Sequence, residues 1–321
     1  MVCFLIILSA VIAVLGLIIA FARSDADLLL MFKARYGKQP ESLAGKVVWI
    51  TGASSGIGEY IAYCLAKAGC RLILSARRQQ ELEQVKQKCL QMSNGQVSED
   101  DIMILPLNVT SYETHRPAVQ KVIDVFNKID ILINNAGRSQ RSKWMDVELN
   151  VDRELFEVNV LGPVSLTQEV LPHMIERKRG QVVVMSSLAG KFGIPHSRSY
   201  SGSKYAVHGY FECLRTEMGE HKIDVTMICP GPVHSNLFLL AARGKQGEVL
   251  NKPDSNEDKK METDRCAYLS CVAIANKLYE SWISEHPFLA FTYVNQYFPF
   301  LGQWYMTKMG VAKLMKLREG Q

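Results

Sequence analysis

The stretch VVWITGASSGIG (residues 47–58) joins a short apolar run to a glycine-rich turn, and apolar residues with helical spacing follow from Ile57 to Ala68. A buried strand that leads through such a turn into a helix is the context in which a dinucleotide pyrophosphate binds. Gly52 permits the tight turn, Gly56 lets the backbone approach the pyrophosphate, and Gly58 allows close helix–strand packing. The positive end of the new helix then faces the phosphates.

Outward from this turn, apolar runs of strand length alternate with helical patterns. Strands are expected near residues 47–50, 71–76, 102–109, 129–133, 181–187, 225–229 and 281–284, and helices near 57–68, 79–92, 151–177, 200–220 and 263–279, with one more ending at 126. Continuous apolar strands that alternate with helices are typical of a parallel sheet covered on both faces. The sequence therefore predicts one α/β domain over residues 46–285, a doubly wound parallel sheet of the Rossmann type.

The end of the second expected strand indicates which dinucleotide binds. A site for NAD usually carries an Asp or Glu about 20 residues after the glycine turn, which holds the ribose 2′-hydroxyl. Here Ser75 and Ala76 are followed by Arg77 and Arg78. Because a guanidinium forms charge-assisted hydrogen bonds with a 2′-phosphate, the sequence favours NADP(H), with Arg77 as the first candidate. The alternative is that the two arginines only begin a solvated helix.

A tyrosine and a lysine point to proton transfer. Tyr200 and Lys204 are four residues apart in a helical segment and so share one face. The pKa of free tyrosine is about 10, and a nearby cation lowers it. Ser187 ends the fifth expected strand, and its hydroxyl can hydrogen-bond a substrate carbonyl. A Tyr–Lys pair alone is common on surface helices, but with Ser187 and the glycine turn it predicts hydride transfer to or from a carbonyl.

These motifs resemble the short-chain dehydrogenase/reductase family over about residues 45–285. The matching strings are TGASSGIG (51–58), NNAG (134–137), NVLG (159–162), YSGSK (200–204) and Pro230-Gly231, together with Ser187. The resemblance implies that Tyr200 is the general acid/base and that Lys204 lowers its pKa and binds the nicotinamide ribose. It also implies that Ser187 binds and orients the substrate carbonyl and that Asn159 fixes a water in a proton relay.

The same resemblance implies a coenzyme site. Its expected members are Gly52, Ser54, Ser55, Gly56, Ile57, Gly58, Arg77, Arg78, Asn108, Asn135, Ala136, Gly137, Tyr200, Lys204, Pro230, Gly231, Val233 and Ser235. Two positions depart from the family pattern. Asn108 stands where an Asp usually contacts the adenine, so we expect altered affinity rather than loss of binding. Ser235 stands where Thr is more usual and keeps the hydroxyl.

Longer strings narrow the resemblance. Residues 170–178, 228–236 and 283–289, with the apolar N-terminus, are similar to a membrane-bound branch of the family. That branch implies an enzyme of the endoplasmic reticulum membrane that handles retinoids, steroids or related apolar carbonyls. Two alternatives stay open: reduction of very-long-chain 3-oxoacyl-CoA, and a non-catalytic scaffold that binds NADP(H). Pairing of relatives through their long helices suggests a homodimer by analogy.

The N-terminus predicts a membrane anchor. Residues 2–22 carry no charge and are almost wholly apolar, which is enough to cross a bilayer as a helix. A cleaved signal peptide is the alternative, because Ala20-Phe21-Ala22 resembles a cleavage site. Cations at 23, 33, 35 and 38 follow the apolar run and predict a cytosolic catalytic domain. We therefore expect an anchor over 1–23, contact with membrane lipid, and a polar linker over 24–45.

The remaining composition mainly excludes functions. The formal net charge of +5 is scattered, which argues against nucleic-acid binding. None of the eight cysteines forms a CxxC pair and the seven histidines lack ligand spacing, so reduced thiols and no metal site are expected. Residues 238–262 form either a solvated loop or a lid over the substrate. The aromatic and basic extension at 286–321 packs in the core, in a dimer contact or on a membrane surface.

Overall fold

The computed structural model describes residues 2–251 and 260–318, apart from some side chains of the first helix. A parallel sheet of seven strands forms its centre, in the order β3-β2-β1-β4-β5-β6-β7. The strands are β1 (Val47–Thr51), β2 (Arg71–Ser75), β3 (Ile102–Ile104), β4 (Ile131–Asn134), β5 (Gly180–Met185), β6 (Ile223–Pro230) and β7 (Glu280–Ile283). The predicted doubly wound α/β fold is confirmed.

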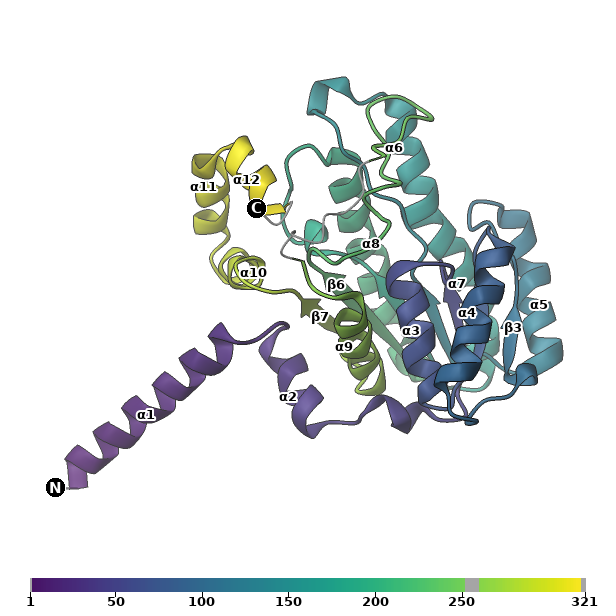
Figure 1. Cartoon of the computed structure of the whole chain (residues 1–321), viewed down its shortest axis with the longest axis horizontal. Helices are drawn as coiled ribbons and strands as arrows, with labels where there is room; N and C mark the ends of the chain where they lie inside the picture. The colour runs from purple at the N-terminus through teal and green to yellow at the C-terminus, as the bar shows by residue number, and fades with distance from the viewer. Residues whose placement is uncertain (1, 252–259, 319–321) are drawn as a thin grey trace.

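Helices cover both faces of the sheet (Figure 1). One face packs against α3 (Gly56–Lys67), α4 (Gln79–Met92) and α9 (Thr263–Ala275), and the other against α5 (His115–Phe126), α7 (Gly162–Glu176) and α8 (Arg198–Met218). Alternation along β1 explains the two layers, since successive side chains of a strand point to opposite faces. Val48 and Ile50 enter the first core, whereas Val47 and Trp49 enter the second.

The strand order determines where a ligand binds. The chain runs outward from β1 to β3 and then returns to β4 on the other side of β1. Crevices form at such a switch point, beyond the carboxyl ends of the strands. Both the glycine turn after β1 and the NNAG turn after β4 therefore lie at one edge of the sheet.

Two expected elements differ in detail. The strand expected at 102–109 ends at Ile104, although Leu105 N and Leu107 N still donate to Leu74 O and Ala76 O, both at 3.0 Å. The helix expected at 151–177 is α6 (Leu149–Phe156), a π-helical turn (Glu157–Leu161) and α7 in succession. Asn159 lies in the π-helical turn, a form that is frequent at functional sites.

Residues 24–45, expected to be a linker, belong to the domain. They contain α2 (Leu28–Tyr36) and a short 3-10 turn. Asp27 caps α2 by accepting from Leu30 N at 2.9 Å, and its carboxylate also accepts from Trp282 N at 2.8 Å. Asp25 pairs with Arg265 at 2.7 Å. Asp25 and Asp27 thus tie the segment expected to be a linker to α9 and β7.

The first helix, α1 (Val2–Ala22), extends away from the domain in Figure 1. Its end is held by Phe21, whose ring packs edge-on against His286 and Tyr293. In the described part of the chain, no helix is both long and apolar enough to cross a membrane. Some side chains of the anchor expected at 1–23 lie outside the described residues, so the anchor stays a prediction.

The C-terminal extension forms three helices beside β7: α10 (Phe288–Tyr297), α11 (Pro299–Met309) and α12 (Val311–Arg318). Leu289 joins a small core with Leu188 and Trp282, whereas Phe300 and Trp304 are exposed. The extension thus packs on the domain through one side only. Of the expected lid at 238–262, residues 252–259 lie outside the described residues, and the lid stays a prediction.

Candidate active site

A cleft of about 660 Å³ lies at the carboxyl edge of the sheet. The glycine turn and both arginines line one end, and Ser187, Tyr200 and Phe238 line the other. Of the predicted site residues, only Gly58 and Asn159 are absent from the lining. The cleft is lined by Gly52, Ser54, Ser55, Gly56, Ile57, Arg77, Arg78, Asn108, Asn135, Ala136, Gly137, Ser187, Tyr200, Lys204, Pro230, Gly231, Val233 and Ser235.

The glycine turn has the geometry that the motif predicts. Gly52 adopts a φ of +66°, which side chains rarely tolerate, and a Cβ there would lie 2.8 Å from Ala136 Cα. A Cβ on Gly58 would lie 2.3 Å from the Asn135 side-chain nitrogen and 2.5 Å from the Gly52 oxygen. Gly58 therefore supports the turn by close packing, behind the cleft. Bare backbone at the start of α3 is suited to a dinucleotide pyrophosphate.

The NNAG turn is fastened to the glycine turn by hydrogen bonds. Asn135 Nδ2 donates to the carbonyls of Thr51 and Gly52, at 3.0 and 3.1 Å. In return, Thr51 Oγ1 accepts from the backbone N–H groups of Asn135 and Ala136, both at 3.1 Å. The two turns form one rigid unit. Thr51 opens the TGASSGIG motif, but its hydroxyl has no role that the spacing of glycines could predict.

The two arginines after β2 differ in their surroundings. Arg78 Nη2 donates to Ser54 Oγ at 3.0 Å and to Ser55 Oγ at 3.1 Å, and Arg78 also pairs with Glu81 at 3.5 Å. Arg77 is exposed at the rim of the cleft. The guanidinium that lies on the phosphate turn is therefore that of Arg78, not of Arg77, the first candidate from the sequence.

Asn108 lines the cleft but is engaged locally. Its Nδ2 donates to Ser111 Oγ at 3.1 Å, and its Oδ1 accepts from the Thr110 hydroxyl at 3.1 Å. The amide thus orders the turn after β3.

Tyr200 and Lys204 lie together on α8, and both are buried at the floor of the cleft. The Lys204 ammonium lies 5.8 Å from the centre of the Tyr200 ring and donates to Met185 O at 2.7 Å. Burial lowers the pKa of Lys204 to about 8, so the side chain is still mostly charged at pH 7. A cation is therefore present where it favours the Tyr200 phenolate.

Ser187 follows β5 and faces the same cleft. Its hydroxyl donates to Pro230 O at 3.2 Å and accepts from Ala189 N at 3.1 Å. The second bond caps the short turn Leu188–Gly190 and fixes the serine. The structure thus brings together the three residues predicted to act on the carbonyl.

Asn159 lies behind the cleft, next to Lys204. Its amide is held by Arg138: Oδ1 accepts from Arg138 N at 2.8 Å and Nδ2 donates to Arg138 O at 2.9 Å. Nδ2 also donates to Ser203 Oγ at 2.9 Å. A Cβ on Gly137 would approach both Asn159 Oδ1, at 3.3 Å, and Lys204 Nζ, at 3.7 Å. The side chains of the expected relay are therefore neighbours.

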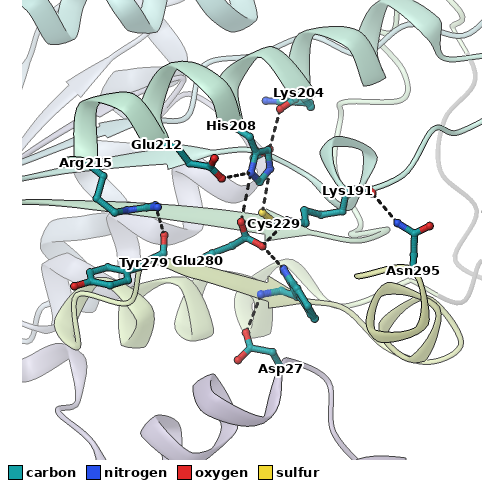
Figure 2. A network of polar contacts seen from close by, with 12 residues as sticks. Asp27, Lys191, Lys204, His208, Glu212, Arg215, Cys229, Tyr279, Glu280 and Asn295 are labelled. Atoms are coloured by element: carbon teal, nitrogen blue, oxygen red, sulfur yellow. Dashed lines mark hydrogen bonds and ion pairs between the residues drawn. The ribbon is translucent and has the colours of Figure 1, made fainter. Parts of the chain in front are cut away.

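A second polar group lies behind Lys204 (Figure 2). His208, Cys229 and Glu280 bring their ligand-type atoms within 4.8 Å of one another, although they are far apart in the sequence. Glu280 already pairs with Lys191 at 3.0 Å and accepts from the Trp282 indole. Burial raises the pKa of Cys229 well above its usual range, which disfavours the metal-binding thiolate. We interpret the group as a structural polar network that ties α8 to β6 and β7.

Comparison with known proteins agrees with this geometry. The sequence pattern described as short chain dehydrogenase matches residues 46–243. The human protein dehydrogenase/reductase SDR family member 7 is 46% identical over 318 residues, 98% of this chain and 93% of the human one. A short-chain dehydrogenase structure from Streptomyces avermitilis is 26% identical with a TM-score of 0.65, covering 83% of this chain and 98% of that one.

An alcohol dehydrogenase from the archaeon Thermococcus sibiricus, solved in complex with 5-hydroxy-NADP, is 25% identical with a TM-score of 0.64. The match covers 75% of this chain and 97% of the archaeal one. The family pattern spans more than half of the present chain, and the human relative spans nearly all of it. The chain belongs to the short-chain dehydrogenase/reductase family of oxidoreductases.

Proposed function

We propose that the protein transfers a hydride between NADP(H) and the carbonyl or alcohol of an apolar substrate such as a retinoid or a steroid. The observation that carries the proposal is the meeting of Ser187, Tyr200 and Lys204 in one cleft with the glycine turn. The family supplies the reaction class. The particular coenzyme and the substrate class are inferred from the side chains that line the two ends of the cleft.

In the direction of reduction, NADPH supplies the hydride when it is bound. The Ser187 hydroxyl gives up its bond to Pro230 O and donates to the substrate carbonyl oxygen instead. The Tyr200 hydroxyl gives its proton to that oxygen as the carbon gains the hydride. The Lys204 ammonium favours the phenolate that remains. The proton returns to Tyr200 from solvent past Lys204 and Asn159. Oxidation of the alcohol reverses these steps.

The choice of NADP(H) rests on Arg78. Arg78 follows β2, where an NAD-specific site would carry a carboxylate, and its guanidinium donates to Ser54 and Ser55 of the glycine turn. A cation there would pair with a 2′-phosphate. The archaeal relative solved with 5-hydroxy-NADP supports the same choice.

The apolar substrate is inferred from the other end of the cleft. Leu188, Phe192, Ile194, Phe238 and Phe288 surround the space beyond Ser187. Binding pockets lined mainly by apolar and aromatic side chains favour ligands that bury hydrocarbon. A retinoid or steroid carbonyl has this character, with one polar atom to meet Ser187 and Tyr200.

The decisive experiment measures NADPH oxidation against retinal, steroid ketones, quinones, aldehydes and a long-chain 3-oxoacyl-CoA. We expect turnover of apolar carbonyls and a loss of about 10²- to 10⁴-fold in kcat for Tyr200→Phe, with NADPH binding retained. Tyr205→Phe, an exposed tyrosine of the same helix, is the matched control. An undiminished rate in Tyr200→Phe refutes the mechanism. Coenzyme binding without any turnover would favour the scaffold, and acyl-CoA turnover alone the acyl reductase.

We also propose that the protein is held at the endoplasmic reticulum membrane by its apolar N-terminal segment, with the catalytic domain in the cytosol. The uncharged run at 2–22 and the cations after it support this arrangement. Alkaline carbonate should leave the full chain in the membrane and extract a chain lacking residues 2–20. Protease added to sealed microsomes should digest the domain. Protection of the domain would contradict the orientation.

A homodimer is proposed through α6 and α8. Phe156, Tyr205 and Tyr210 are exposed on these elements, and aromatic side chains are enriched at interfaces. Light scattering after gel filtration should give twice the chain mass, and Tyr210→Asp should lower it to one chain. Tyr279→Asp, on an exposed tyrosine elsewhere, should leave the dimer intact.

A further inference from the structure

A small apolar pocket of about 70 Å³ adjoins the catalytic cleft. It lies between the loop that follows Ser187 and the three C-terminal helices, with walls from Ile194, Phe291, Met306 and Leu314. Phe192, Ile194 and Phe288 line both this pocket and the cleft. The two spaces therefore share a wall, and a molecule that extends from the cleft into the pocket must pass these three side chains.

The chemistry of the pocket is uniform. Among the residues that the structure describes, no charged residue lines it, and only Tyr305 carries a polar group on its side chain. Phe291 packs edge-on against Phe192, with ring centres 4.8 Å apart, and lies 6.1 Å from the Tyr305 ring. Met306 and Met309 complete the lining, and methionine adapts to hydrocarbon of varied shape. A hydrated or charged group would lose its water here without gaining a partner.

The sizes of the cleft and the pocket indicate that they bind different parts of one substrate. The cleft of about 660 Å³ includes the coenzyme end, so the space beyond Ser187 is only part of it. The pocket of about 70 Å³ is too small for a whole substrate but large enough for a short hydrocarbon end. The described residues thus form one polar contact site for a carbonyl, at Ser187 and Tyr200, and one apolar contact site for hydrocarbon, beside α10 and α11.

We propose that this pocket binds the far apolar end of an elongated substrate while its carbonyl meets Ser187 and Tyr200. The substrate class is then an extended hydrocarbon carbonyl whose end opposite the reacting group carries no charge or hydroxyl. The inference rests on the proposed function. It adds that Met306, Phe291 and Leu314, which lie far from the reacting atoms in the chain, determine which substrates bind well.

The test is a series of straight-chain aldehydes of increasing length, reduced with NADPH. In the unaltered protein, kcat/KM should rise by up to about fourfold per methylene once the chain reaches the pocket, because each buried methylene contributes transfer free energy. Met306→Trp fills the pocket and should lower kcat/KM for the long aldehydes at least tenfold while leaving the short ones unchanged. Gln303→Trp adds the same ring on an exposed position of α11 and is the control.

A second variant keeps the proposal testable if the tryptophan disturbs folding. Met306→Ala enlarges the pocket and should move the best chain length upward. Equal losses for short and long aldehydes in Met306→Trp, or a chain-length profile that neither variant alters, would overturn the proposal. Because short aldehydes report the catalytic site alone, their reduction separates failure of this pocket from failure of the proposed function. Turnover of a steroid ketone without turnover of any aldehyde would overturn this proposal alone, and absence of turnover for every carbonyl would overturn both.

Discussion

Arg77 and Arg78 are adjacent in the chain but differ in what they touch. Only Arg78 donates to Ser54 and Ser55, so its guanidinium is held against the glycine turn. We expect Arg78→Ala to raise KM for NADPH by about 10- to 100-fold, the loss of one or two charge-assisted hydrogen bonds, and to leave KM for NADH almost unchanged. Arg77→Ala should have the smaller effect. Steady-state kinetics at a fixed carbonyl concentration measures both.

Two results would contradict this assignment. Equal use of NADPH and NADH by the unaltered protein would exclude a 2′-phosphate site. A larger rise in KM for NADPH in Arg77→Ala than in Arg78→Ala would assign the 2′-phosphate to Arg77, the first candidate from the sequence.

Lys204 gives the site a pH dependence. Burial lowers its pKa to about 8, so kcat/KM for NADPH, which reports the free enzyme, should be level below pH 8 and fall above it as the ammonium is lost. The folded-state pKa is below the ordinary 10.5, so between these values the unfolded chain binds more protons. The contribution of Lys204 to stability therefore rises from pH 8 to 10.5.

Above pH 8, the expected fall in kcat/KM and the expected change in stability have opposite directions, so the two can be measured separately. Activity should fall between pH 8 and 10.5, where the cost of burying Lys204 declines, so circular dichroism should show no unfolding at pH 9 due to this group. A kcat/KM that stays flat to pH 10 would contradict a role for the Lys204 charge.

At the scale of elements, Glu280 joins β7 to α8. Burial alone would raise the pKa of Glu280, but hydrogen bonding with His208 and the charge of Lys191 lower it to about 2 (Figure 2). Its contribution to stability is therefore present above pH 4.5 and lost as the pH falls towards 2. We expect Glu280→Gln to reduce the free energy of unfolding by roughly 2 to 3 kcal/mol at pH 7.

Urea denaturation at pH 7 and pH 3 measures this effect, and the difference from the unaltered protein should shrink at pH 3. Glu212→Gln is the matched control, because Glu212 lies 3.9 Å from the same histidine but is more exposed. Equal losses of stability in the two variants would show that the carboxylate of Glu280 has no special part in holding β7.

The elements also show how far sequence reasoning extends. Apolar runs and helical spacing predicted the layers of the sheet because both periods are local properties of the chain. The glycine turn, Ser187, Tyr200 and Lys204 were found because each stands at a strand end or on one helix face. The bonding of Arg78 could not be predicted, since Arg77 and Arg78 have the same sequence context and only the packed turn distinguishes them.

Contacts between segments that are distant in the sequence could not be predicted either. The group of His208, Cys229 and Glu280 depends on the register of β6, β7 and α8, which no local pattern encodes. The polar residues at 24–45 looked solvated because Asp25 and Asp27 find their partners, Arg265 and Trp282, more than 200 positions later.

For the whole molecule, the contacts of residues 24–45 determine how far the N-terminus can be shortened without loss of stability. Removal of residues 2–20 keeps Phe21 and the bonds of Asp25 and Asp27, so we expect a melting temperature within about 2 °C of the full chain. Removal of residues 2–38 takes away α2, including the buried Leu30, and should lower the melting temperature by more than 4 °C. Thermal unfolding of the three proteins in the same detergent decides. Equal melting temperatures of all three proteins would show that residues 24–38 do not stabilise the domain and act as a linker.

The bonds of Asp25 and Asp27 also constrain the order of events during synthesis. A ribosome releases the N-terminal segment early, but Arg265 and Trp282 are translated about 240 and 255 residues after their partners. Until then Asp27 has no backbone partner on β7, and the strand that closes the sheet does not exist. Docking of some of the first residues made must therefore wait until late in synthesis, and a nascent chain stalled before α9 would carry α2 undocked.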